Sequence, residues 1–424
     1  MEVQTTKTGP WKWIPTLYFS QGLPYVIVMT VSVIMYKNLE ISNADIAFYT
    51  SWLYLPWVIK PLWSPFVEIF STRRRWILAT QFVLGVSLAC VALTIPMDAF
   101  FQYSLAFLWL MAFSSATHDI ASDGFYLLSM DSKQQSFFVG IRSTFYRISM
   151  VAGQGLLVVF AGYLESTLQN VKTAWSIVFG CAAVFYLCFC LYHRFVLPVP
   201  DSDHKGEAQA FSKVVERFLS TFKSFFQKEQ IGVSIVFLMC YRLGESQLVK
   251  LASPFLLDDR AVGGLGLVTS EVGVIYGTFG VIALTLGGIL GGVLASRNGL
   301  KKWIWWMLMA INLPNVVYIY LSFVQPDSFV LITTAVVVEQ FGYGFGFTGY
   351  LLYMIYMAKG KFSTAHYALA TGFMALGMMV PGMVSGWIQE MVGYQYFFVW
   401  VVIATIPSFV VTAFLKIDKS FGVK

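Results

Sequence analysis

The chain has 424 residues, of which 57% are hydrophobic and only 12% are charged, and its mean hydropathy is +0.68. This composition is typical of lipid-embedded proteins and excludes an ordinary water-solvated globular enzyme. We attribute the net charge of +6 to membrane topology and to attraction for anionic lipid headgroups, and we expect no nucleic-acid partner.

Apolar stretches follow one another along the chain, each about 20 residues long and therefore able to cross a bilayer as a helix. The sequence predicts an all-α membrane protein with 12 transmembrane helices. These spans are expected near 13–36, 46–66, 76–97, 101–128, 136–163, 172–197, 231–257, 269–296, 302–324, 329–357, 363–390 and 393–415.

Lysine and arginine are distributed unequally between the two sets of alternating loops. One set holds twenty of them, and the opposite set holds only Lys37, Lys172 and Arg260. Because positively charged loops stay on the cytoplasmic side, this bias predicts that both termini and the long middle loop are cytoplasmic.

A hydrophilic connector, 198–229, separates six spans from six. The sequence therefore predicts an N-terminal six-helix bundle over 1–197 and a C-terminal six-helix bundle over 230–424. Within the connector, aromatic and aliphatic residues recur at the spacing of one helical face, which predicts an amphipathic helix along the inner membrane surface, or else an ordinary solvated linker helix. The residues of this face are Phe211, Val214, Val215, Phe218, Leu219, Phe222, Phe225 and Phe226.

The two halves also resemble each other. Asp45 precedes Trp76 by 31 residues across a span and a basic turn, and Glu271 precedes Trp303 by 32 in the same way. Such parallel repeats, with six spans on each side of one linker, favour a major facilitator fold with a cavity between the bundles.

Span four carries Asp119 and Asp123 on one helical face, since they are four residues apart. Span five returns through the same depth, so Arg142 is level with Asp123, whereas Arg147 lies about 140° around the helix. Charges at this depth indicate a polar pathway. One hypothesis is that an arginine binds an acidic substrate group while a carboxylate takes up a proton; the alternative is a permanent ion pair that fixes the packing.

Span seven carries Arg242 and Glu245, three residues apart, which predicts a salt bridge along the helix. Lys250 lies nearer the outer end, where its long side chain is expected to reach the headgroups. Glu339, followed by Gln340, lies in the middle of span ten without a cation nearby in the sequence. It is a second candidate for proton coupling, and the alternative is a hydrogen-bonded buried acid.

Glycines follow Glu339 at a spacing that allows close helix approach: Gly342, Gly344, Gly346 and Gly349. On span two, Lys60 precedes Pro61 and either snorkels to the inner face or enters the polar pathway. Gln21 on span one offers a hydrogen-bonding group for a sugar.

Enzyme signatures are absent from the sequence, which has no Walker A loop, no zinc-ligand cluster and no G-x-S-x-G elbow. We therefore expect no enzyme, no catalytic residue, no cofactor and no metal, and we expect ion gradients as the energy source. A membrane-embedded acyltransferase that uses His118 or His366 as a base is a remote alternative.

Several segments together resemble the AmpG family of major facilitator permeases. They are Ser20–Pro24, Lys60–Pro65 with Arg73–Arg75, His118–Asp123, Tyr241–Glu245, Glu339–Gly342 and Phe362–Leu369. The resemblance implies a symporter of the bacterial inner membrane that imports N-acetylglucosaminyl-anhydro-N-acetylmuramyl peptides (muropeptides) with protons for cell-wall recycling.

The resulting hypothesis is a proton-coupled importer of a sugar or sugar-peptide that works by alternating access. The proton-coupling candidates are Asp119, Asp123, Glu245 and Glu339, and the substrate-binding candidates are Arg142, Arg147, Arg242, Lys60, Gln21 and Gln340. The alternative within transport is an oligosaccharide facilitator or symporter.

Overall fold

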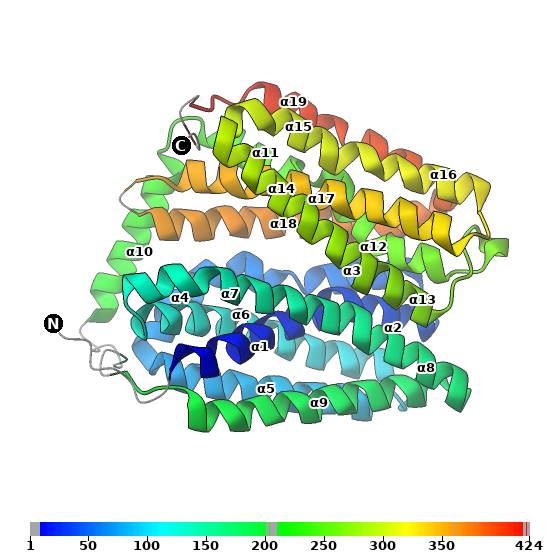
Figure 1. The fold of residues 1–424 in the computed structure, drawn as a ribbon, viewed down its shortest axis with the longest axis horizontal. Helices are drawn as coiled ribbons and strands as arrows, with labels where there is room; N and C mark the ends of the chain where they lie inside the picture. The colour runs from blue at the N-terminus through cyan, green and yellow to red at the C-terminus, as the bar shows by residue number, and fades with distance from the viewer. Residues whose placement is uncertain (1–8, 201–202, 204–209, 361, 419–420, 422–424) are drawn as a thin grey trace. The chain divides into compact units, whose positions relative to one another are not determined.

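The computed structural model describes residues 9–200, 203, 210–360, 362–418 and 421. Within this part of the chain all regular secondary structure is helical, which confirms the predicted all-α class (Figure 1). Contacts divide the chain into two compact units: unit 1 contains 1–32 and 59–218, and unit 2 contains 33–58 and 219–424.

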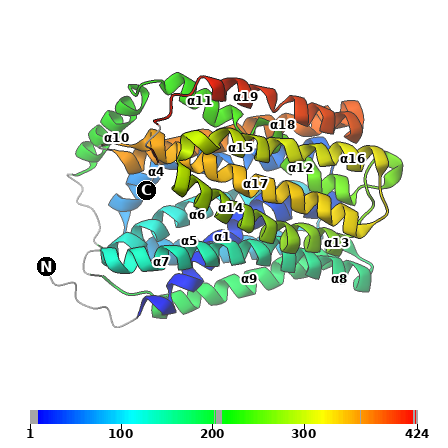
Figure 2. The same cartoon turned by 45° about the horizontal axis from the view of Figure 1, so that its top comes forward.

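In unit 1, α5 packs against both α6 and α9, and α1 packs against α7 (Figures 1 and 2). Side chains at the helix starts accept the free amide hydrogens of the first turn: Thr72 does so for α5, Asn170 for α9, and Asp131 forms a capping box with Gln134 at α7. The helices of this unit are α1 (Ile14–Val26), most of α4 (Leu55–Phe70), α5 (Arg73–Thr94), α6 (Phe100–Leu128), α7 (Ser132–Met150), α8 (Val158–Leu168), α9 (Val171–Val196) and the first half of α10 (Ala210–Phe226).

In unit 2, α17 packs against α14 and α15 (Figure 2), and α18 packs against α3 and α12. Its helices are α2 (Ser32–Asn38), α3 (Asn43–Trp52), α11 (Ile231–Cys240), α12 (Leu243–Leu257), α13 (Thr269–Val274), α14 (Val281–Asn298), α15 (Leu300–Asn312), α16 (Val316–Val324), α17 (Phe329–Ala358), α18 (Ser363–Ile403) and α19 (Ile406–Ala413). The described residues also contain three wider π-helical stretches, at Ile27–Val31, Val151–Leu157 and Ile275–Gly280.

Eight helical stretches of the described chain are long and apolar enough to cross a membrane. One of them, Ala365–Ala413, covers the two predicted spans 363–390 and 393–415. Between these two spans the helix is broken at Gly393, whose φ is 75°. Three predicted spans are not among these eight. Two of them, 46–66 and 231–257, are interrupted near Leu53 and Tyr241, and the third, 101–128, corresponds to α6, which carries more polar residues. Twelve crossings are compatible with this pattern and stay a prediction.

The boundaries of the two predicted six-helix bundles, 1–197 and 230–424, also stay a prediction, because a division of the chain by contacts between residues does not define helical bundles. Contacts place 33–58 with the C-terminal helices and divide α10 after Phe218.

The predicted amphipathic linker helix corresponds to α10. Phe225 is fully buried and stacks on Phe373 of α18, with ring centroids 6.1 Å apart. The second half of α10 therefore packs on α18 through Phe225, and its location along the inner membrane surface stays a prediction. The side chains of the predicted face from Phe211 to Phe218 lie outside the described residues.

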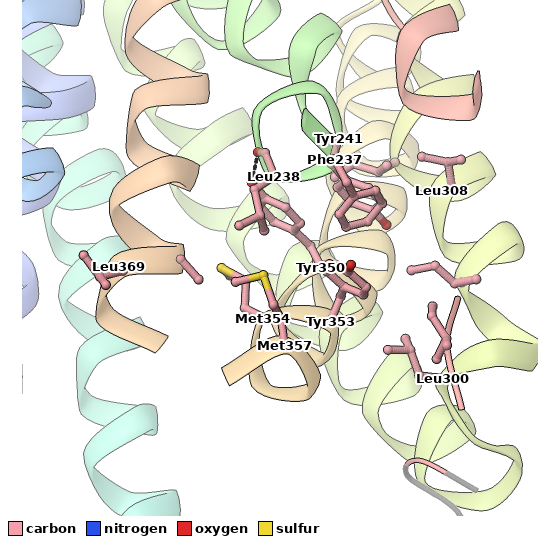
Figure 3. Close-up of a cluster of buried hydrophobic side chains, with 14 of the residues drawn as sticks. Phe237, Leu238, Tyr241, Leu300, Leu308, Tyr350, Tyr353, Met354, Met357 and Leu369 are labelled. Carbon is pink, nitrogen blue, oxygen red and sulfur yellow. Dashed lines mark hydrogen bonds between the residues drawn. The ribbon is translucent and has the colours of Figure 1, made fainter. Parts of the chain in front are cut away.

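Aromatic side chains form much of the core of unit 2. Tyr241 of α11's C-terminal end stacks on Tyr350 of α17, with centroids 4.8 Å apart, and Phe237 meets Tyr353 edge to face at 4.6 Å (Figure 3). Leu308 and Met354 belong to the same cluster (Figure 3). This packing connects α11, α15 and α17 into one body.

The predicted close approach of glycine-bearing helices occurs where α14 meets α17. A Cβ atom on Gly287 would lie 2.1 Å from the Phe341 carbonyl oxygen, and one on Gly344 would lie 2.0 Å from that of Leu284. Only glycine permits this backbone contact without a shift of the helices.

Replacing Gly287 with alanine should therefore separate α14 from α17, at a cost of about 1–3 kcal/mol typical of overpacking. The matched control is Gly292→Ala in the same helix, where a Cβ meets nothing within 4 Å. Alanine's higher helix propensity should leave that variant as stable as the original chain or slightly more stable. Thermal unfolding in detergent compares the two, and equal melting temperatures would contradict the packing argument.

Candidate functional site

Most of the candidate site residues and their polar partners fall into two groups, one within each unit. The unit 1 group contains Tyr18, Lys60, Asp119, Asp123, Tyr126 and Arg142, and the unit 2 group contains Arg242, Glu245, Tyr276, Tyr318, Glu339, Gln340 and Tyr343.

In unit 1, Asp123 of α6 and Arg142 of α7 are neighbours, in line with their equal predicted depth. Arg142 Nη1 lies 3.4 Å from Asp123 Oδ1 and donates to the Tyr18 hydroxyl at 3.1 Å. The guanidinium also lies over the rings of Tyr18 and Tyr126, 5.0 and 4.9 Å from their centroids. The side chains of Asp123 and Arg142 remain 48% and 30% exposed. This is a long, accessible ion pair, and such pairs contribute little to stability.

The local sequence explains why α7 returns beside α6. α6 ends at Leu128, and the Asp131 capping box starts α7 three residues later. With so short a turn the two helices run antiparallel, so residues at equal distances from the turn become neighbours.

Asp119 pairs with a different cation, Lys60. Lys60 Nζ of α4 lies 3.5 Å from Asp119 Oδ2, and the Asp119 side chain is only 16% exposed. Lys60 is thus directed at a carboxylate of another helix, so the snorkelling interpretation of this residue is wrong. Sequence analysis missed this pair because periodicity gives the face and depth of a residue but not the neighbour of its helix.

Two further candidates of unit 1 have incomplete hydrogen bonding. Within the described residues, Arg147 Nη1 and Gln21 Oε1 are buried without a hydrogen-bond partner. Such groups are costly unless another molecule or state satisfies them. They are therefore retained as candidates for substrate binding.

In unit 2, Arg242 lies at a break between α11 and α12, where its φ and ψ of −114° and 26° depart from helical values. It donates to the Tyr343 hydroxyl at 2.5 Å, and its guanidinium covers the rings of Tyr343 and Phe347 at 4.9 and 5.1 Å. Arg242 and Glu245 form no ion pair within the described chain, so the predicted salt bridge is wrong. The predicted geometry requires a continuous helix, and the break removes it.

Glu245 of α12 and Glu339 of α17 are two acids buried within reach of each other's charge. They are 3% and 2% exposed and interact electrostatically. Glu339 Oε2 accepts a hydrogen bond from Gln340 Nε2 at 2.9 Å. The side chain of Tyr318 also interacts with the Glu339 carboxylate, and the Tyr318 hydroxyl forms a hydrogen bond with the Tyr276 hydroxyl. Glu245 Oε2 and Glu339 Oε1 have no hydrogen-bond partner among the described residues. Two nearby carboxylates favour a state in which one proton is bound.

Lys250 differs most from its expected position. It is 2% exposed, and its Nζ donates to Thr50 Oγ1 at 2.9 Å, so it does not reach headgroups as the sequence suggested. The sequence did contain a signal for this buried position: seven more helical residues follow Lys250 before α12 ends, so the residue is far from the helix end.

The described part of the chain contains no group of three or more metal-ligating side chains. A polar cavity of about 530 Å³ occurs in unit 2, away from the predicted site residues, with four lysines in its lining: Lys228, Lys301, Lys359 and Lys416. Burial lowers the pKa of Lys228, whose Nζ donates to the carbonyl groups of Met357 and Lys359.

Comparisons with known proteins agree with this architecture. The family model described as the Major Facilitator Superfamily matches residues 16–365. The chain is 25% identical to the putative transporter AmpG 4 of Rickettsia conorii, with 93% of this chain and 94% of that one covered. It is also 25% identical to the anhydromuropeptide permease of Escherichia coli K12, with 93% and 77% covered. These matches confirm the predicted resemblance to the AmpG permeases.

Among solved structures, the fold is similar to that of the nucleoside transporter NupG, with a TM-score of 0.69, 16% identity, and 97% of this chain and 100% of that one covered. The relatives and the fold are those of multi-pass membrane transporters of small molecules and not those of enzymes. The chain belongs to the Major Facilitator Superfamily.

Proposed function

We propose that this protein imports muropeptides, or related amino-sugar compounds, across the bacterial inner membrane together with protons, by alternating access and with both termini in the cytoplasm. Similarity to a protein named anhydromuropeptide permease supports the substrate class. The observation that carries the coupling proposal is the buried pair of acids, Glu245 and Glu339, with one unpartnered oxygen on each among the described residues.

The pair suits reversible proton binding. Two buried carboxylates close to each other cannot both remain ionised cheaply, so one proton relieves their repulsion. Gln340 already donates to Glu339 Oε2, while Glu245 Oε2 and Glu339 Oε1 have no hydrogen-bond partner among the described residues and are available to take up a proton. In this proposal the proton enters from outside, stays while the substrate is carried, and leaves to the cytoplasm.

The unit 1 group has a complementary role in the proposal. Arg142 is accessible and only loosely paired with Asp123, so it can exchange this partner for an anionic substrate group. Arg147, Lys60 and Gln21 extend the same binding function, as Arg242 and Gln340 do in unit 2. Asp119 and Asp123 are further positions where a proton can replace a departing cation.

A proton gradient supplies enough work for accumulation. One charge moving through 100 mV gives about 2.3 kcal/mol, and one pH unit adds about 1.4. At about 1.4 kcal/mol per factor of ten, one proton sustains a gradient on the order of a few hundredfold.

The basic lining of the polar cavity supports a role for membrane lipids as partners. Four lysines there, with Glu229 and Asp418 also present, leave an excess of positive charge that attracts anionic headgroups.

Replacing Glu339 with glutamine should abolish gradient-driven accumulation, because the amide keeps the shape but cannot bind the transported proton. We expect the ratio of internal to external muropeptide in proteoliposomes to fall from up to a few hundredfold to about one. Exchange of labelled for unlabelled substrate, which needs no net proton movement, should persist. The measurement is uptake under an imposed proton gradient, with and without a protonophore.

Glu216→Gln is the matched control, since Glu216 is exposed on α10. It should accumulate substrate normally. Full accumulation by Glu339→Gln, or uptake by the original chain that a protonophore leaves undiminished, would defeat the coupling proposal.

Arg142→Gln and Asp123→Asn distinguish a binding arginine from a structural ion pair. If Arg142 binds substrate, Arg142→Gln should raise the KM for an anionic muropeptide about tenfold or more, the loss expected for one charged hydrogen bond. Asp123→Asn should change KM much less. Arg297→Gln, at an exposed position of α14, is the control. A permanent pair predicts instead that both single variants lose stability and that the double variant recovers it.

Competition separates the proposed substrate from the alternative one. An excess of unlabelled anhydro-muropeptide should suppress uptake of the labelled compound, and neutral disaccharides should not. Suppression by neutral disaccharides and not by anhydro-muropeptide would favour an oligosaccharide facilitator or symporter.

A further inference from the structure

Lys250 is a cation buried without an acid among the described residues. It lies on α12, is 2% exposed, and its Nζ bonds the neutral Thr50 hydroxyl at 2.9 Å, while the Tyr54 ring centroid is 5.2 Å away. No carboxylate of the described chain lies within ion-pair distance of it.

This environment does not balance the charge. An ammonium group removed from water needs a counter-charge, and one neutral hydroxyl with one aromatic ring replaces only part of its hydration. The charge is therefore better explained by another state of the protein, in which it has an anionic partner.

The surroundings of Lys250 are polar and tightly closed. Ser51 of α3 is fully buried, and its Oγ has no hydrogen-bond partner among the described residues. α18 covers the two residues, since a Cβ on Gly382 would lie 2.7 Å from Ser51 Oγ and 3.5 Å from Lys250 Cγ. An anion can therefore reach Lys250 only if α3 or α18 moves away from α12.

Besides its close packing on Gly386 of α18, α3 and the end of α2 make polar contacts with α12 and α18 that a movement would exchange. We call Lys37, Asn43, Asp258, Gln389, Glu390 and Tyr394 the α3 latch. Lys37 pairs with Asp258 at 2.6 Å, Asn43 donates to Gln389 and to Tyr394 at 2.8 Å, and Glu390 accepts the Ala44 amide at 2.9 Å. Water can replace these polar partners at small net cost.

The backbone on both sides of α3 is irregular. The π-helical stretch Ile27–Val31 precedes Val33, where contacts pass from unit 1 to unit 2. The helix is interrupted again at Leu53 and Tyr54, shortly before contacts return to unit 1 after Val58. Such irregular turns are common places for a hinge.

We propose that Lys250 is an anion-binding residue of the transport path, and that its ammonium group exchanges the Thr50 hydroxyl for a carboxylate of the substrate when α3 leaves α12. Lys250 is eight residues from Asp258 of the latch, about 12 Å along a helix, and five residues from Glu245. It therefore lies between the latch and the buried acids. Taking the anion to be a substrate carboxylate rests on the proposed function.

The first test uses Lys250→Met, which keeps the length of the side chain without its charge. We expect kcat/KM for a peptide-bearing anhydro-muropeptide to fall at least tenfold in proteoliposomes, and to change much less for the same compound with amidated carboxyl groups. Lys250→Arg should recover part of the loss. The melting temperature of Lys250→Met should equal or exceed that of the original chain, because a buried unpaired charge is removed. Lys172→Met, which removes a lysine near Phe100 in unit 1, should change neither quantity.

Two results of this test would overturn the proposal. One is unchanged transport of the carboxylate substrate by Lys250→Met. The other is a lower melting temperature together with equal losses for both substrates, as a structural lysine would produce. If the original chain itself transports no muropeptide, the proposed function fails, and the second test still judges Lys250.

The second test measures access and needs no substrate. In a variant without the five native cysteines, Lys250→Cys should react with a membrane-impermeant methanethiosulfonate carrying a sulfonate, added from outside. Leu238→Cys should not react, because Leu238 is equally buried but belongs to the aromatic core of unit 2. A Lys250→Cys variant that is folded and never reacts would show that α3 does not expose this position.

Discussion

A charged side chain inside an apolar helical protein requires a counter-charge, a polar partner or water, and this requirement explains the contacts of the charged candidate residues in both units. In unit 1 it pairs Asp123 with Arg142 and Asp119 with Lys60. In unit 2 it is met less completely, since Glu245 and Glu339 each keep an oxygen without a partner among the described residues. Incomplete pairing is expensive in a single static state. It is expected in a carrier, where protons and substrate supply the missing partners in turn.

Unit 2 combines a fixed core with a segment held by polar contacts. Aromatic packing among Phe237, Tyr241, Tyr350 and Tyr353 fixes α11 against α17, and close glycine contacts fix α14 against α17. α3 also packs closely on α18, where a Cβ on Gly386 would lie 2.2 Å from the Asn43 carbonyl oxygen, but it adds buried hydrogen bonds through Asn43. Apolar packing resists change, whereas polar contacts can be exchanged for water, so a movement of α3 would exchange these hydrogen bonds and would also have to separate its close contact with α18.

The sequence predicted the helical class, the family and the residues that carry charge at depth, because length, hydropathy and helical period are local properties. It also predicted that Asp123 and Arg142 lie at the same depth, since a short turn joins their helices, and the structure finds the two side chains paired. It failed where the answer depended on distant segments or on a local break. Lys60 pairs with Asp119 across 59 residues, Lys250 is covered by α3, and the break before Arg242 separates it from Glu245. None of these follows from periodicity, because the period does not specify which helix packs on which face.

The central claim is that substrate and proton move together through a protein whose buried acids are incompletely paired. The most direct measurement is the pH outside weakly buffered proteoliposomes when muropeptide is added without any imposed gradient. The account predicts that the external medium becomes alkaline as substrate enters, in fixed proportion to the substrate taken up, and that Glu339→Gln shows no such change. Substrate entry without any proton movement would contradict it.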